Sequence, residues 1–270
     1  MVTRPASIAQ VPTWNRVVNL VKFKSKIRGE TIRDSVRGEL ATVLPRVLEP
    51  EAMDTPEDAA EYDAMDHATV NARFVADFLT MHGPCRGGTL LDVGTGTARI
   101  PIELAGVDPW ARILGADLAE HMLAVASRNV ARACLERRIE LDQVDAKGLP
   151  YLNARFEAVV SNTIIHHVPR PEFVLLEILR LVAAGGTVFV RDLVRPDAAD
   201  QVTALVDLYT KGESPSARAL FEASLHAALT LAEIRAMLVT LGHSADEVNM
   251  TSDRHWTWAW RDSSTIPGVA

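Results

Sequence analysis

The feature that most constrains the fold is a short glycine loop between an apolar run and a helical pattern, within Leu90–Ile100. The apolar run ends at Asp92 and Val93, and the turn that follows is Gly94-Thr95-Gly96. A strand, a tight glycine loop and a helix N-terminus in this order build a nucleotide-cofactor site. Glycine suits the loop because it lacks Cβ and adopts positive φ, so the backbone can approach a ligand closely. An acid just ahead of the glycines suits a ligand that carries an ammonium group.

Strand and helix patterns alternate after this loop. Short apolar runs predict five strands, at Thr89–Val93, Arg112–Ala116, Ile139–Gln143, Ala158–Ser161 and Thr187–Val190. Helical spacing predicts helices at Arg99–Ala105, Ala119–Glu136 and Arg170–Leu181, with Gly185-Gly186 as a helix stop ahead of the fifth strand. This alternation indicates βαβ units and a parallel sheet.

The alternation ends after Pro196. Residues 198–228 are predicted to be helical without an intervening strand, and Thr230 caps a further helix over Leu231–Leu241. Val248–Thr251 and His255–Trp260 then resemble a strand pair, in which three tryptophans share one face and are expected to pack on the last helix. We therefore expect an α/β fold: a doubly wound, Rossmann-like sheet of seven strands, mostly parallel with an antiparallel last strand, plus N-terminal and inserted helical lids.

Two domains are predicted along the chain. Residues 1–48 are expected to form a basic N-terminal arm, helical or partly disordered, and residues 49–270 the main domain. The lid helices are placed at about 55–82 and 198–228. The lysines and arginines between Lys22 and Arg37 are interpreted as a solvated helix face, with a weak contact to an anionic surface or RNA as the alternative.

Composition narrows the function classes. The net charge of −7 gives no general support for nucleic-acid binding. The two cysteines, Cys85 and Cys134, form neither a disulfide framework nor a CxxC pair, which fits a reducing cytoplasm. No stretch of 18 apolar residues is present, so we expect neither a membrane span nor secretion. The oligomeric state is left open.

Carboxylates follow the second and third predicted strands. Asp117 is placed to accept hydrogen bonds from both ribose hydroxyls of a nucleoside, although Asp117-Leu118-Ala119-Glu120 also has the spacing of a capping box. Asp145-Ala146 is placed to meet the exocyclic amine and a ring nitrogen of adenine, or else forms an ordinary surface turn.

Polar residues also follow the fourth and fifth strands. Ser161-Asn162-Thr163 precedes a histidine pair, His166-His167, at the strand end where α/β proteins bind ligands. Histidine titrates near neutrality, so either member is a candidate general base, and Asp192 is a third candidate. Arg191, Asp192 and Arg195 are expected either to pair with one another or to bind an anionic substrate.

The string Asp92-Val93-Gly94-Thr95-Gly96, followed in order by Asp117, Asp145-Ala146, Ser161-Asn162 and Gly185-Gly186-Thr187-Val188, resembles the class I S-adenosylmethionine-dependent methyltransferases over roughly residues 55–260. The histidine pair is most similar to the branch that includes quinone and other small-molecule methyltransferases. The resemblance implies S-adenosylmethionine as cofactor, a small-molecule acceptor and no metal. Its implied cofactor-binding residues are Tyr62, Asp92, Gly94, Thr95, Gly96, Asp117, Leu118, Met122, Asp145, Ala146 and Ser161.

The resemblance also argues against some acceptors. Methyltransferases of base amino groups carry a Pro-Pro-aromatic string after the fourth strand, and here Asn162-Thr163-Ile164 stands in its place. Two other function classes stay open: a nicotinamide-dependent oxidoreductase, which the missing third glycine of the loop disfavours, and a non-catalytic cofactor-binding protein.

Overall fold

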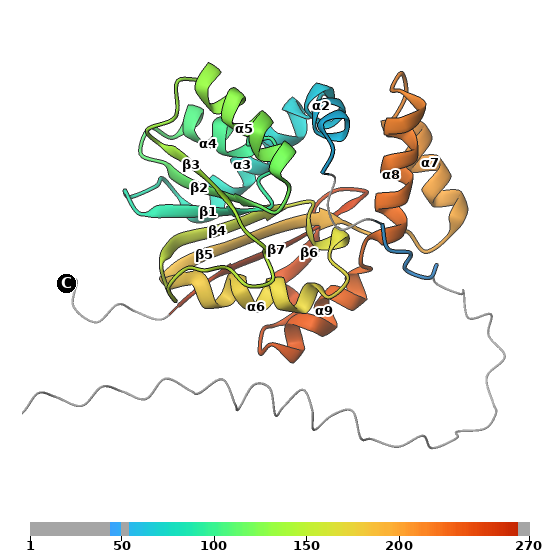
Figure 1. Ribbon diagram of the computed structural model, residues 1–270. Coiled ribbons are helices and arrows are strands. Elements are labelled where there is room, and N and C mark those ends of the chain that lie inside the picture. The colour runs from blue at the N-terminus through green and yellow to red at the C-terminus, as the bar shows by residue number, and fades with distance from the viewer. Residues whose placement is uncertain (1–43, 50–53, 264–270) are drawn as a thin grey trace, which may run out of the picture. The chain divides into compact units, whose positions relative to one another are not determined.

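A seven-stranded sheet forms the centre of the computed structural model, which describes residues 44–49 and 54–263 (Figure 1). The strands are β1 Thr89–Val93, β2 Arg112–Asp117, β3 Ile139–Gln143, β4 Phe156–Asn162, β5 Val182–Leu193, β6 Val248–Met250 and β7 His255–Arg261. The helices are α2 Pro56–Ala64, α3 Ala68–His82, α4 Arg99–Val107, α5 Glu120–Arg132, α6 Pro171–Leu181, α7 Ala199–Tyr209, α8 Pro215–Ala227 and α9 Leu231–Thr240, with short 3-10 turns η2 Ile165–His167 and η3 Ala245–Glu247.

The strand order is β3-β2-β1-β4-β5-β7-β6. Strands β1 to β5 pair in parallel, and β7 runs antiparallel to both β5 and β6. The chain therefore reverses its direction of progress across the sheet between β1 and β4, the switch point where doubly wound folds bind ligands. The predicted fold class is confirmed, including the antiparallel last strand.

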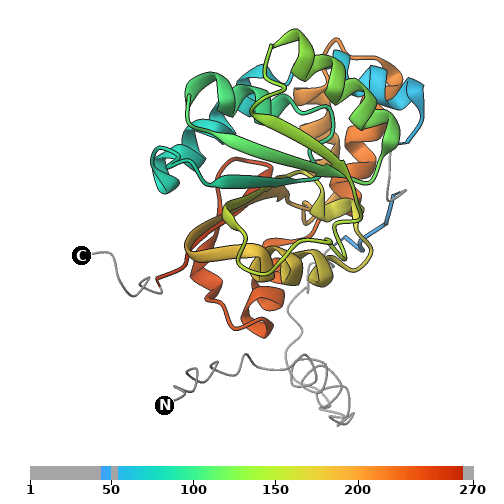
Figure 2. The same cartoon turned by 60° about the vertical axis from the view of Figure 1, so that its left-hand side comes forward.

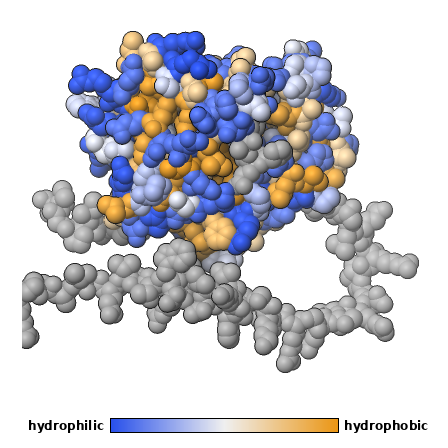
Figure 3. Space-filling model, in the orientation of Figure 1, coloured by the Kyte–Doolittle hydropathy of each residue, from blue (hydrophilic) through white to orange (hydrophobic). Residues whose placement is uncertain are grey.

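Helices cover both faces of the sheet (Figures 1 and 2). On one face α3, α4 and α5 bury side chains such as Phe74, Phe78 and Leu104 against β1 and β2. On the other face α6 and α9 pack against Trp256 and Trp258 of β7, as the tryptophan spacing predicts. Hydrophobic residues lie toward the middle of the face seen in Figure 3, with hydrophilic ones around them.

Several boundaries differ from the predicted ones. Residues 198–228 form two helices, because Gly212 adopts φ +91° and Ser214-Pro215 caps and starts α8. Strand β5 begins at Val182 and already contains Gly185-Gly186, where the register with β4 shifts; a Cβ on Gly186 would lie 2.8 Å from the carbonyl oxygen of Glu157. The glycine pair therefore lies within β5, where it permits a close approach of β5 to β4, and does not precede β5.

The predicted N-terminal lid separates into two parts. Helix α3 belongs to the layer that covers the sheet, and only residues near its start, Val70 and Asn71, face the ligand cavity described below. The predicted domain boundary at residue 48 stays a prediction. The predicted basic arm lies outside the described residues, apart from 44–48. Among the described helices, none has the length and apolar character needed to cross a membrane.

Candidate active site

A cavity of about 420 Å³ opens at the carboxyl ends of the parallel strands. Its floor is made by the residues that follow β1, β2, β3 and β4, and its walls by α2, the start of α3, α7 and α8. This volume lies in the range of small-molecule sites in proteins. Of the predicted cofactor-binding residues, eight line the cavity: Tyr62, Gly94, Gly96, Asp117, Leu118, Met122, Asp145 and Ala146.

The glycine loop forms the floor. The backbone N–H groups of Gly94 and Thr95 both donate to the carbonyl of Ala116, at 2.8 and 3.0 Å. Gly94 and Gly96 adopt φ +75° and +54°, which side chains disfavour. A Cβ on Gly94 would lie 2.0 Å from Cγ2 of Ile164, so the loop is pressed against the turn that follows β4.

Three predicted cofactor-binding residues lie beneath this floor. Asp92 is 2% exposed and accepts a hydrogen bond from the Thr95 hydroxyl at 2.7 Å, and Ser161 is fully buried and donates to the carbonyl of Val93 at 2.8 Å. Burial raises the pKa of Asp92 to about 7, because it penalises the ionised carboxylate. Asp92, Thr95 and Ser161 thus support the loop from below, and their direct contact with a cofactor stays a prediction.

Asp117 lies on the cavity floor with both carboxylate oxygens turned to backbone donors. One oxygen accepts from Gly96 N–H at 2.7 Å and the other from Ala119 N–H at 2.9 Å. Burial raises the pKa of this carboxyl despite these hydrogen bonds. The predicted capping box is wrong, because helix α5 begins at Glu120 without a side-chain cap. The Asp117 carboxylate instead accepts hydrogen bonds from Gly96 and Ala119, and so connects the glycine loop to the end of β2.

The other predicted cofactor-binding residues that line the cavity lie near Asp117. Met122 packs with Tyr62 in a small apolar cluster, and Leu118 is 41% exposed beside them. Asp145 pairs with Lys147, whose Nζ lies 3.0 Å from its carboxylate. Apolar surface therefore alternates with carboxylates along the part of the cavity next to β2 and β3.

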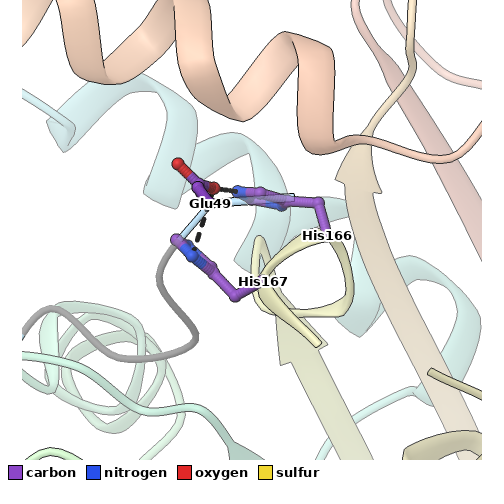
Figure 4. A group of neighbouring side chains, drawn as sticks. All are labelled: Glu49, His166 and His167. Atoms are coloured by element: carbon purple, nitrogen blue, oxygen red, sulfur yellow. Dashed lines mark ion pairs between the residues drawn. The ribbon is translucent and has the colours of Figure 1, made fainter. Parts of the chain in front are cut away.

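A cluster of ionisable groups is centred on His166 and His167, which line the cavity, and Figure 4 shows these two histidines with Glu49. Nδ1 of His166 lies 2.5 Å from Asp192, whose second oxygen accepts the His166 backbone N–H at 3.1 Å. Nε2 of His166 and Nδ1 of His167 lie 3.4 and 3.2 Å from the same oxygen of Glu49. Burial lowers the pKa of His166, but the charges of Asp192 and Glu49 outweigh it and raise the value overall.

The sequence did not reveal Glu49 or Arg46 as part of this cluster. Arg46 donates to the carbonyls of Ala227, His166 and Val168, at 2.6, 3.0 and 3.1 Å, and so fixes residues 44–49 over η2. Arg46 and Glu49 lie in an irregular segment without a motif, so their neighbours in the sequence do not predict a contact with η2.

The two arginines near the end of β5 pair with acids. Arg191 binds Asp77 at 2.8 Å and Arg195 binds Glu233 at 2.6 Å, and neither lines the cavity. The expected pairing of Arg191, Asp192 and Arg195 with one another is therefore wrong, and Asp192 pairs with His166.

Residues 91–190 match a methyltransferase domain family. The chain is 34% identical over 111 residues to a demethylmenaquinone methyltransferase of Desulfitobacterium hafniense, covering 41% of this chain and 44% of that protein. It is 35% identical over 109 residues to a phosphatidylethanolamine N-methyltransferase of Cereibacter sphaeroides, covering 40% of this chain and 52% of that protein. The chain thus spans about half the length of the curated relatives it matches.

A solved structure shares the fold. An S-adenosylmethionine-dependent methyltransferase from Aquifex aeolicus superimposes with a TM-score of 0.55 at 16% identity, over 77% of this chain and 98% of that one. At this identity the likeness concerns the fold alone.

Proposed function

We propose that the chain is a class I S-adenosylmethionine-dependent methyltransferase that transfers a methyl group to a small-molecule acceptor bound in the cavity. The observation that carries the proposal is the convergence of the glycine loop, Asp117 and Asp145-Ala146 on the floor of one cavity. These groups follow β1, β2 and β3 in turn, and the strand order places them side by side.

The residues present fit the cofactor. Gly96 leaves open space toward the cavity, since a Cβ there would meet only Cε1 of Tyr62, at 3.9 Å. Asp117 offers carboxylate oxygens for ribose hydroxyls, and Leu118 and Met122 supply apolar surface for a purine ring. Asn162, at the end of β4, lines the same cavity, and its Oδ1 is buried without a hydrogen-bond partner among the described residues, so a bound ligand can supply one.

When bound, this cofactor supplies a methyl group on a sulfonium, which reacts by in-line displacement. The protein therefore needs no covalent nucleophile, and its main task is to hold the acceptor in line with the methyl group, which contributes up to about 7–11 kcal/mol in favourable cases. Helices α7 and α8 cover the site with Tyr209, Leu220 and Phe221, and so exclude water from it.

Proton transfer is assigned to the cluster after β4 and β5. For a hydroxyl or amine acceptor, His166, His167 and Asp192 are the groups we propose to take up the proton. His166 and His167 line the cavity, and Asp192 holds the His166 ring from behind. A thiolate or stabilised carbanion acceptor needs no base.

The acceptor is proposed to be a small molecule with an apolar body. Leu193, Leu220 and Phe221 line the cavity on the side of the histidine cluster. The relatives reported above are named for a quinone, demethylmenaquinone, and a phospholipid, phosphatidylethanolamine. Both compounds have a large apolar part, which agrees with an apolar acceptor. The cytoplasmic location inferred from the cysteines remains a prediction, and Cys85 and Cys134 are unpaired.

Calorimetry with S-adenosylmethionine and with NAD tests the proposal. We expect one S-adenosylmethionine to bind per chain and NAD not to bind. Asp117→Ala is expected to weaken cofactor binding about 10- to 150-fold, because hydrogen bonds to a charged acceptor contribute about 1.5–3 kcal/mol. Asp200→Ala, at an exposed position in α7, is the matched control.

Two results would contradict the proposal. The methyltransferase proposal would be contradicted if the wild-type chain gave the circular-dichroism spectrum of a folded protein but did not bind S-adenosylmethionine. Tight cofactor binding without transfer of labelled methyl to any member of a metabolite library would favour the non-catalytic binding protein.

A further inference from the structure

Three metal-ligating side chains converge beside the cavity: Glu49, His166 and His167 (Figure 4). Their donor atoms all lie within 4.8 Å of one another, and the Glu49 oxygen lies 3.4 Å from Nε2 of His166 and 3.2 Å from Nδ1 of His167. Ligands bound to a tetrahedral ion at about 2.0–2.1 Å are about 3.3–3.4 Å apart. The two distances to Glu49 therefore match neighbouring corners of such a coordination sphere.

Surrounding residues hold these donors in place. Asp192 binds Nδ1 of His166 at 2.5 Å, so that Nε2 is the nitrogen turned toward Glu49. A carboxylate behind a ligating imidazole is the usual support in histidine metal sites. The hydroxyl of Ser224 lies 3.2 and 3.4 Å from the two oxygens of Glu49, and Arg46 anchors the segment that carries this glutamate.

The donor set indicates the class of ion. Two imidazole nitrogens and one carboxylate oxygen suit Zn²⁺ and other divalent transition metals, whereas Mg²⁺ and Ca²⁺ prefer oxygen ligands only. With three protein ligands, a fourth position is left, and His166 and His167 both border the cavity.

We propose that Glu49, His166 and His167 bind a divalent transition-metal ion whose remaining coordination position faces the cavity. There it binds an oxygen donor of the ligand, and the identification of that ligand as the methyl acceptor rests on the proposed function. Because the ion occupies Nε2 of His166 and Nδ1 of His167, the proton uptake proposed for these histidines applies to the metal-free chain. Local sequence patterns do not predict such a site, because its histidines are adjacent and its glutamate lies in a distant irregular segment.

The test is a metal titration of tag-free full-length protein after treatment with a chelator and its removal. Titration calorimetry with Zn²⁺ is expected to give one ion per chain. Titration with Co²⁺ is expected to give the intense visible absorption of a four-coordinate site. Glu49→Gln and His167→Ala are expected to weaken Zn²⁺ binding at least 10- to 100-fold. His121→Ala is the matched control, since this exposed histidine pairs with Asp54 away from the cluster.

The outcomes separate this inference from the proposed function. A folded wild-type chain that binds S-adenosylmethionine but not Zn²⁺ would overturn the metal site alone. So would Zn²⁺ binding that both cluster variants retain at wild-type affinity. Zn²⁺ binding that the cluster variants lose and the control keeps would support the site, even in a chain that does not bind S-adenosylmethionine. Cofactor calorimetry and circular dichroism on the same variants identify any loss that comes from misfolding.

Discussion

The buried carboxyl of Asp92 is expected to make the stability of the protein depend on pH. Its pKa is about 7 in the folded chain, against an ordinary value of 3.8, and burial is the main cause. Because the folded state holds this proton more tightly than the unfolded chain does, its contribution to stability is complete below about pH 4. The contribution declines as the pH rises and is lost above about pH 7. With 1.36 kcal/mol per pKa unit, the total loss is about 4 kcal/mol.

Asp92→Asn removes this titration and keeps an oxygen that can accept the Thr95 hydroxyl. Urea unfolding without cofactor at pH 5 and pH 8 measures the effect. Between these values, the unfolding free energy of the variant minus that of the wild type is expected to increase by about 2.5 kcal/mol. Glu136→Gln, at an exposed position, is the control and is expected to give no such increase. An Asp92→Asn difference that is the same at both pH values would refute the reasoning.

Two further substitutions test the packing that positions the site, both by urea unfolding. Gly94→Ala is expected to cost about 1–3 kcal/mol, because the new Cβ meets Ile164 at a backbone φ of +75°; Gly106→Ala in α4, with nothing within 4 Å, should be neutral or stabilising. Trp258→Ala is expected to cost about 3–5 kcal/mol, since Trp258 is fully buried, whereas Trp110→Ala, at 69% exposure, should stay within about 0.5 kcal/mol. Equal costs within either pair would contradict the packing described.

Local order along the chain predicts which of the expected site residues lie at one edge of the sheet. Gly94, Gly96, Asp117 and Asp145 all line the cavity, because each follows a parallel strand and the strands end at one edge of the sheet. Local order does not predict the direction in which each of these side chains points. Ser161 is at the end of β4 like the others, yet its hydroxyl turns into the sheet and binds the carbonyl of Val93.

The order of strands and helices, the glycine loop and the acids at the strand ends can be predicted from the amino-acid sequence. These features depend on hydrophobic periodicity and turn chemistry, which act over a few residues. The contact of Arg46 and Glu49 with the cluster of His166, His167 and Asp192 could be found only in the folded chain. That meeting depends on packing between segments far apart in the chain, where Arg46 binds three carbonyls and Glu49 contacts both histidines. Local sequence patterns do not predict such contacts, because the contacts contribute free energy only once the sheet has brought the segments together.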